Sequence, residues 1–434
     1  MAIDNLKEKF KNKILSEKEE LFKNIDRLIR INSVEGESLE GAPFGVEPKK
    51  ALEEALKISE EMGFKTKNID NAIGYAEYGE GEEYICVIGH VDIVPVGEGW
   101  SYDPLKLTIT KDKLYGRGIL DNKGPIMSAL YGLKILKDLD ITLSKKVRII
   151  FGTNEETGFK DIPYYLKNEK PPIMGFTPDC KYPAVYGERG ILDLTIWSTK
   201  IKENISIEGE FKNNVVPSYA KININGNCII EERGKQAPGN APEIGENAVT
   251  KAFTSLSEKQ LSEELKEFAD FIKNNFHENH YMEKSGVKCE DEISGKLVIN
   301  PYKIEEKDSK LGISVVFRYP ITYKYEDILK IIDSIKNEEY DISINRRMDS
   351  VCFPLDSKLL KELKKAYEDV TGEDGTPVTT TGGTYAKVFP NIVAFGPSFP
   401  GQKGIAHNKD EYMDINDLLK NTEIFTNAIY NLAK

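Results

Sequence analysis

The chain has 434 residues, with 59 lysines and arginines against 71 aspartates and glutamates, which gives a formal net charge of −12. Nucleic acids and anionic membranes attract a basic face, so we expect neither as a partner. With 40% hydrophobic and 30% charged residues, the composition is typical of a soluble globular protein. The five cysteines form no CxxC pair and the N-terminus lacks the apolar core of a signal peptide, so the expected compartment is the cytoplasm.

Both ends of the chain alternate between helical and strand-like segments. Apolar residues at helical spacing predict four helices: 21–29, 48–62, 124–139 and 358–371. Short apolar runs bounded by polar residues or glycine predict four buried strands: 84–89, 147–152, 173–176 and 392–396. This alternation predicts an α/β domain in which helices cover a mostly parallel sheet.

The middle of the chain has a different pattern. Apolar and polar residues alternate in four segments, as in sheets with one solvated face: 192–196, 220–224, 312–317 and 340–344. Two amphipathic helices are expected over 261–276 and 328–335. We therefore expect an α+β insert at 190–345 that divides the α/β domain into 1–189 and 346–434.

Histidines and carboxylates follow the ends of the four strands predicted in the α/β domain: His90 and Asp92, Glu155 and Glu156, Asp179, and His407. Ligands of open α/β sheets bind outside the carboxyl ends of the strands. Any one of these residues could be a turn residue or helix cap, but four strands ending this way favour a site. Imidazole and carboxylate groups suit a pair of divalent cations, with structural polar residues as the alternative.

The spacing within two of these groups suggests a division of roles. In an extended chain His90 and Asp92 point the same way, so that Asp92 could orient a metal-binding imidazole. Adjacent Glu155 and Glu156 would point to opposite sides, so that one could bind metal and the other act as a general base. The glycine-rich segment 381–384 lacks the lysine of a P-loop. It is either a turn whose backbone N–H groups hold a substrate carboxylate or an ordinary glycine turn.

Eight motifs, spread over nearly the whole chain, occur in the same order as in a known family. They are GHVDIVPVGEGW (89–100), GRGILDNKGP (116–125), GTNEETGFKD (152–161), TPDCKYPAVYGERG (177–190), NNVVP (213–217), FRYP (317–320), TTGGTYA (380–386) and AHNKDEYM (406–413). The chain resembles the co-catalytic zinc peptidases and deacylases that include carboxypeptidase G, aminoacylase, succinyl-diaminopimelate desuccinylase and carnosinase. It looks most like the PepV-type bacterial dipeptidases. The resemblance implies a zinc-aminopeptidase-like catalytic domain in two parts, 1–189 and 346–434, and an inserted lid domain at 190–345.

The resemblance also implies two divalent metal ions, zinc above all, with manganese or cobalt as alternatives. It assigns the following roles: His90 and Asp179 bind one ion, Glu156 and His407 bind the other, Asp121 bridges them, Asp92 orients His90, and Glu155 is the general base. In the lid domain, Arg318 would hold the terminal carboxylate of a peptide, assisted by Asn214 and the backbone of Gly383.

One position departs from the family pattern. Family lids carry a histidine that donates to the oxyanion of the tetrahedral intermediate, and this chain has Pro238 there, within an otherwise preserved framework. Proline has neither a side-chain donor nor a backbone N–H. Losing one such donor typically costs about 10²–10³ in turnover. His277 and His280 match no family motif and lie at the end of the helix expected over 261–276.

The sequence therefore predicts a cytoplasmic, monomeric metallodipeptidase whose substrates are short peptides with a free C-terminal carboxylate. A water between the two metals would attack the scissile carbonyl while Glu155 transfers the proton. Two alternatives remain open at this point. One is a deacylase of N-acyl amino acids, and the other is a metal-bound peptide-binding protein with weak catalysis, which Pro238 suggests.

Overall fold

The computed structural model describes residues 2–434, which divide into two compact units. Unit 1 contains the chain up to Tyr186, Phe353–Val378 and Gly383–Lys434. Unit 2 contains Gly187–Cys352 and Thr379–Gly382. Unit 2 is thus slightly longer than the expected insert at 190–345, and it includes a short second segment that the sequence did not assign to it. The segment Thr379–Gly382 belongs to unit 2 because its backbone is hydrogen-bonded there: Arg189 N donates to Thr380 O at 3.2 Å.

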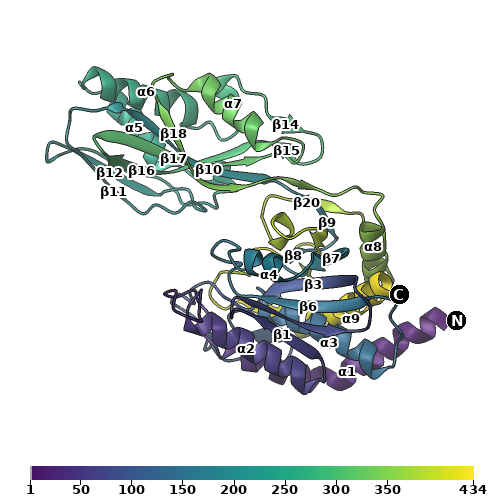
Figure 1. Cartoon of the computed structure of the whole chain (residues 1–434). Helices are drawn as coiled ribbons and strands as arrows, with labels where there is room; N and C mark the ends of the chain where they lie inside the picture. The colour runs from purple at the N-terminus through teal and green to yellow at the C-terminus, as the bar shows by residue number, and fades with distance from the viewer. Residues whose placement is uncertain (1) are drawn as a thin grey trace. The chain divides into compact units, whose positions relative to one another are not determined.

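Within the described residues, unit 1 is built mainly from one large sheet and six α-helices (Figure 1). Its helices are α1 (Ala2–Ile29), α2 (Val46–Glu61), α3 (Lys123–Asp138), α4 (Ile162–Asn168), α8 (Lys358–Thr371), α9 (Ile415–Ala433) and the 3₁₀ turn η3 (Tyr385–Lys387). The strands of the large sheet are β1 (Lys65–Ile69), β2 (Ile73–Tyr78), β3 (Tyr84–His90), β6 (Lys146–Gly152), β7 (Met174–Thr177), β9 (Val185–Glu188), β19 (Val351–Cys352), β20 (Val378–Thr380) and β21 (Ile392–Ala394). Of these, β19 and the last two residues of β9 and of β20 fall within the ranges of unit 2. Short strands complete the unit: β4 (Thr108–Ile109), β5 (Lys113–Tyr115), β8 (Cys180–Lys181), β22 (Pro397–Ser398) and β23 (Tyr412–Asp414).

The large sheet has the order β1-β2-β6-β3-β7-β21-β9-β19, with β20 paired to β9. Its central strands β6, β3, β7 and β21 are parallel, as the apolar runs predict, and antiparallel strands flank them on both sides. Helices cover both faces. A Cβ on Gly74 of β2 would meet Leu52 and Leu56 of α2, whereas the next side chain, Tyr75, packs against Tyr165 of α4. Successive strand residues face opposite sides, so α2 and α4 lie on opposite faces of the sheet.

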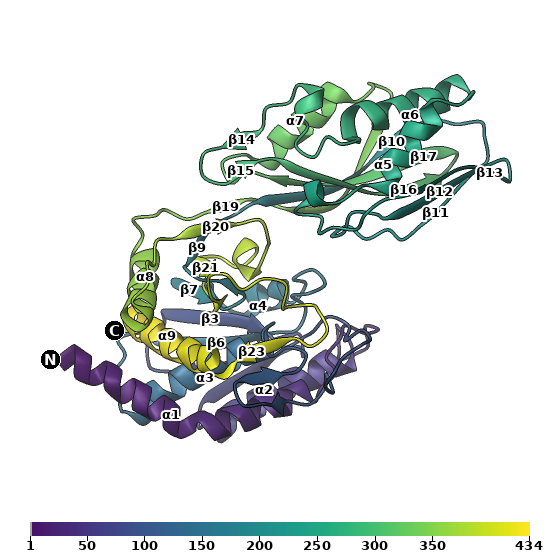
Figure 2. The same ribbon diagram turned by 180° about the vertical axis from the view of Figure 1, so that it is seen from behind.

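Unit 2 contains two larger antiparallel sheets, the two-stranded antiparallel sheet β14-β15 and three α-helices, all within the described part of the chain (Figure 2). The four-stranded sheet has the order β16-β17-β10-β18, and the three-stranded sheet has the order β11-β12-β13. The strands are β10 (Gly190–Lys200), β11 (Ile205–Gly209), β12 (Tyr219–Ile224), β13 (Asn227–Arg233), β14 (Glu290–Asp291), β15 (Gly295–Lys296), β16 (Val298–Lys307), β17 (Lys310–Tyr319) and β18 (Asp341–Met348). The helices are α5 (Ala248–Ser257), α6 (Glu263–Phe276), α7 (Tyr325–Ile335) and the 3₁₀ turns η1 (Pro242–Ile244) and η2 (Glu283–Ser285).

The alternation along the strands of unit 2 separates an apolar face from a polar one. Leu192 and Leu194 of β10 lie in the apolar core of the unit, together with Phe268 and Ile272 of α6. Asp193, between the two leucines, points away from this core and is buried among polar groups. Both units confirm the α/β and α+β patterns of the sequence. None of the described helices is long and apolar enough to cross a membrane.

Candidate functional site

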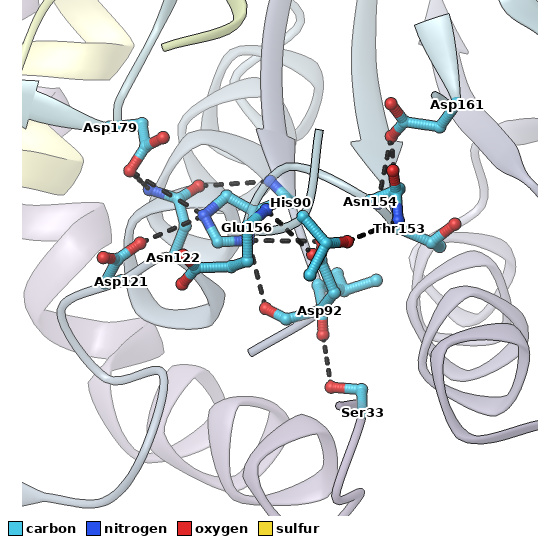
Figure 3. A network of polar contacts seen from close by, with 12 residues as sticks. Ser33, His90, Asp92, Asp121, Asn122, Thr153, Asn154, Glu156, Asp161 and Asp179 are labelled. Atoms are coloured by element: carbon cyan, nitrogen blue, oxygen red, sulfur yellow. Dashed lines mark hydrogen bonds and ion pairs between the residues drawn. The ribbon is translucent and has the colours of Figure 1, made fainter. Parts of the chain in front are cut away.

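Loops at one edge of the parallel strands of unit 1 carry the expected metal ligands, of which Figure 3 labels His90, Asp121, Glu156 and Asp179. β3 ends at His90, and Asp179 follows β7. Glu156 lies in the turn after β6, Asp121 lies just before α3, and His407 lies between β22 and β23. Strands β6, β3 and β7 are parallel, so their carboxyl ends meet at this edge.

The two carboxylate oxygens of Asp121 face two different histidines. Oδ1 lies 3.0 Å from Nε2 of His90, and Oδ2 lies 2.9 Å from Nε2 of His407. Asp179 Oδ1 is 3.8 Å from the same nitrogen of His90, and both oxygens of Glu156 are 3.2 Å from that of His407. Asp121 therefore lies between two groups, each of which contains one imidazole and one further carboxylate.

The cluster is buried on one side and open on the other. The side chain of His90 is 0% exposed and those of Glu156, Asp179 and Asp121 are 7%, 11% and 16% exposed, whereas that of His407 is 50% exposed. A solvent-borne ion or substrate would therefore reach the cluster from the His407 side.

The ring of His90 is oriented by its own loop. Nδ1 lies 3.0 Å from the backbone oxygen of Asp92 and 3.4 Å from the carboxylate Oδ1 of the same residue. A carbonyl only accepts, so Nδ1 carries a proton. Nε2 faces Asp121 and Asp179; it donates to Asp121 when it is protonated, and its lone pair could otherwise bind a cation. Asp92 has a second contact, which the sequence did not predict. Its Oδ2 accepts the backbone N–H of Glu156 at 3.2 Å.

Glu155 and Glu156, whose side chains were predicted to point to opposite sides, do not lie in an extended segment. Both residues lie in a turn, whose backbone is closed by a hydrogen bond from Phe159 N to Asn154 O at 2.7 Å. The turn nevertheless separates the two side chains. Ligand atoms of His90, Glu155 and Asp179 lie within 4.8 Å of one another, and those of His90, Asp121 and Glu156 form a second such group.

Crowded negative charge changes the proton affinity of these carboxyl groups. Burial and then the charge of Asp121 raise the pKa of Glu156 to about 7 and that of Asp179 to about 6. Burial and then the charge of Asp179 raise the pKa of Glu155 well above its usual range. Burial acts in the same direction on Asp121, but hydrogen bonds from His407 and His90 outweigh it and lower the pKa.

These residues fit divalent cations on the chemistry of their donors. Imidazole nitrogen and carboxylate oxygen are the ligands that zinc and manganese take in proteins. At His90, two carboxylates approach one nitrogen that can carry at most one proton. Cations at this cluster would replace the protons that its carboxyl groups otherwise retain.

One predicted substrate-binding residue of unit 2, Arg318, contacts the segment Thr379–Gly382. Arg318, on β17, donates from Nη1 to Thr381 O at 2.8 Å, and its Nε is buried with no hydrogen-bond partner. Burial, followed by repulsion from Arg346, lowers the pKa of Arg318 to about 10. Among the described residues no carboxylate forms an ion pair with this guanidinium.

Asn214 lies in a loop that is tied to the loop of Pro238. The backbone oxygen of Asn214 accepts the N–H of Gly239 at 2.7 Å, and Asn240 donates to the Thr381 hydroxyl at 3.2 Å. Gly383 begins the next segment of unit 1, and only the single 3₁₀ turn η3 follows it, so no full helix N-terminus forms there.

The two remaining histidines line a different part of unit 2. His277 and His280 border a cavity of about 280 Å³ together with Pro242, Gly245 and Thr250. Nδ1 of His277 lies 3.2 Å from the hydroxyl of Thr250, which fixes the ring against α5. Burial lowers the pKa of both imidazoles, so both are neutral near pH 7.

Two residues that support the cluster could not be recognised from the sequence. Asn122 donates to Pro178 O at 2.6 Å and also reaches Asp179, so it joins the loop before α3 to the loop after β7. Asp161 accepts the backbone N–H groups of Thr153 and Asn154 and so closes the turn that carries the two glutamates (Figure 3). Asn122 stands beside Asp121 in the motif at 116–125, but its contact depends on tertiary structure that no spacing reveals.

Comparison with known proteins identifies the family. The sequence pattern of the peptidase family M20/M25/M40 matches residues 86–431. The chain is also 34% identical to "Putative dipeptidase YtjP" of Bacillus subtilis (strain 168), over 97% of this chain and 99% of that protein. The chain therefore belongs to the peptidase family M20/M25/M40. It is a hydrolase that acts on peptide bonds.

Solved structures share the fold at low sequence identity. Human carnosine dipeptidase 1 superposes with a TM-score of 0.63 at 15% identity, covering 98% of both chains. The YXEP protein of Bacillus subtilis, described as a dinuclear metal binding peptidase from the M20 family, superposes with a TM-score of 0.53 at 10% identity, covering 96% of this chain and 99% of that chain. These similarities confirm the fold class predicted from the sequence.

Proposed function

We propose that the chain is a metal-dependent dipeptidase that uses two divalent cations, with zinc as the first candidate. The observation that carries the proposal is the position of Asp121, whose two oxygens face His90 and His407. Asp179 would complete the first metal site and Glu156 the second. Similarity to a Bacillus protein named as a dipeptidase, and to the dinuclear metal binding YXEP peptidase, supports a dipeptidase with two metals.

The reaction needs a nucleophilic water, a polarised carbonyl and a proton carrier. Bound divalent cations would supply the first two, because they acidify water and withdraw electrons from a carbonyl. Glu155 would supply the third. Its raised pKa suits a group that takes a proton from the attacking water and returns it to the leaving amine. Asp92 would fix the ring of His90 and, through its second oxygen, the backbone at Glu156.

The substrate would be a short peptide with a free C-terminal carboxylate. Arg318 would bind that carboxylate, because its guanidinium has a buried Nε without a partner and its Nη1 donates to a backbone oxygen rather than to a carboxylate. A planar guanidinium matches a carboxylate with two parallel hydrogen bonds. Asn214 and the backbone of Gly383 would assist.

A hydrolysis screen on the metal-reconstituted protein tests this proposal. The panel contains dipeptides, the same dipeptides amidated at the C-terminus, and N-acyl amino acids. We expect the free dipeptides to be hydrolysed fastest. Preference for N-acyl amino acids would favour the deacylase alternative, and tight dipeptide binding with negligible turnover would favour a peptide-binding protein.

A further inference from the structure

A buried carboxylate outside the proposed ligand set holds the loop that carries Asp121. Glu411 precedes β23, and its side chain is 0% exposed. Its Oε1 accepts three backbone N–H groups, from Gly118 at 3.1 Å, Leu120 at 2.9 Å and Asp121 at 3.1 Å. One carboxylate oxygen therefore fixes the backbone of this loop up to and including Asp121.

The second oxygen of Glu411 connects the same loop to the loop after β3. Oε2 accepts Nη1 of Arg117 at 2.6 Å, and Arg117 is 2% exposed. The guanidinium of Arg117 also donates to Val96 O at 3.4 Å and lies 5.1 Å from the ring centre of Trp100. Trp100 in turn donates to Val96 O at 2.6 Å. The segment 91–100, which begins directly after His90, is thus tied to Glu411 through Arg117.

Glu411 also limits the freedom of the segment that carries His407, four residues before it. His407 and Asp410 both have left-handed backbone conformations, with φ of 63° and 55°. Such residues need support from their surroundings. Asp410 binds the N–H of Ser101 at 2.7 Å, and the backbone oxygen of Glu411 accepts Gly116 N at 3.1 Å. The His407 segment is therefore anchored where it leads into β23.

We propose that Glu411 is a positioning residue for the metal centre, which sets Asp121 and His407 at the separation that one cation needs. This inference rests on the proposed function, because it concerns the same ions. A carboxylate is required at this position. It can accept from three N–H groups and from Arg117 at once, whereas an amide would always turn its NH₂ group toward one of these donor sets.

The test is Glu411→Gln, examined by calorimetric titration of the metal-free full-length chain with Zn²⁺ and, separately, Mn²⁺. Residues that orient metal ligands typically change metal affinity by 10–100-fold when they are replaced. We expect one of two ions, the one bound by Asp121, Glu156 and His407, to bind about 10–100-fold more weakly. The ion bound by His90 and Asp179 shares Asp121 as a ligand, so it should also bind more weakly, but by a smaller factor, because Asp92 and Asn122 still hold its other two ligands.

A matched control separates positioning from general stability. Glu169→Gln removes a similar carboxylate, which pairs with Arg148 at 2.7 Å and lies at the end of α4, away from the cluster. We expect the control to lower the unfolding temperature and to leave both metal affinities unchanged. If Glu411→Gln does not fold, Glu411→Asp is used in its place, since it keeps the charge and withdraws the carboxylate from the N–H groups.

The outcomes distinguish this inference from the proposed function. Wild-type binding of two ions, with both affinities unchanged in the Glu411 variant, would overturn the positioning role and leave the two-metal proposal in place. Binding of fewer than two ions by the wild type would overturn both. A larger loss of affinity for one ion than for the other, with turnover restored at saturating metal, would support the positioning role.

Discussion

The charged groups at the candidate sites of the two units differ in what they contact. In unit 1 the cluster around Asp121 is connected internally, since each histidine already contacts at least two carboxylates. In unit 2 Arg318 donates to a backbone oxygen and has a buried nitrogen without a partner. Buried charges are usually paired with an opposite charge, so a buried guanidinium that donates to a backbone oxygen and forms no ion pair among the described residues favours an anionic ligand.

The difference indicates two kinds of ligand. The cluster of unit 1 has an excess of negative charge that cations would balance, whereas the guanidinium of Arg318 calls for an anion. A peptide that is bound at its carboxylate and hydrolysed at its amide would supply that anion. Variants that change one region at a time should therefore affect different steps, and to different degrees.

The largest effect is expected within the turn of unit 1. Glu155→Gln should lower kcat by about 10²–10⁴, because a general base is removed, while both ions stay bound. Glu156→Gln should instead release one ion, because it removes a ligand next to His407. Metal analysis after gel filtration, together with kcat at saturating metal, separates these results. Equal metal loss in both variants would show that the two adjacent carboxylates have been assigned the wrong roles.

The same turn shows which parts of the site are predictable from sequence. The strands ending at His90 and Gly152 could be predicted, because apolar runs bounded by polar residues have few alternatives. The turn at Glu155 could not, because Asp161 closes it from farther along the chain. The sequence shows Glu411 as part of the motif at 406–413, but its contacts could not be predicted, since its three N–H partners lie about 290 residues earlier.

The second effect concerns Pro238 in unit 2, where the resemblance described in the sequence analysis leads us to expect a histidine. We expect low wild-type turnover with ordinary substrate binding, because oxyanion donors act mainly in the transition state. Pro238→His should raise kcat by up to about 10²–10³ and leave KM nearly unchanged.

The double variant His277→Ala/His280→Ala is the control for this change. The two imidazoles border a separate cavity with Pro242, so removing them should leave kcat unaltered. A wild-type rate that is already typical of an efficient peptidase, and that persists in the double variant, would show that this chain needs no histidine donor.

A smaller effect is expected at Arg318. Hydrogen bonds to charged groups contribute about 1.5–3 kcal/mol, so Arg318→Ala should raise KM for free dipeptides by about 10–150-fold. KM for C-terminally amidated dipeptides should change little, because they have no carboxylate to lose. Arg347→Ala is the control, since Arg347 is an exposed arginine of β18 whose partner is Asp349. Equal behaviour of free and amidated substrates would remove Arg318 from the substrate site.

The smallest effect is expected in the local stability of the two units, measured by hydrogen exchange with and without zinc. A ligand at one hundred times its dissociation constant stabilises the form that binds it by about 2.7 kcal/mol. Because all proposed metal ligands lie in unit 1, zinc should slow hydrogen exchange in the loops that carry His90, Asp121 and Glu156. Exchange in β10 and β17 of unit 2 should stay the same. Equal protection of both units would mean that the cations stabilise the whole chain, and the division of roles between the two regions would then have to be abandoned.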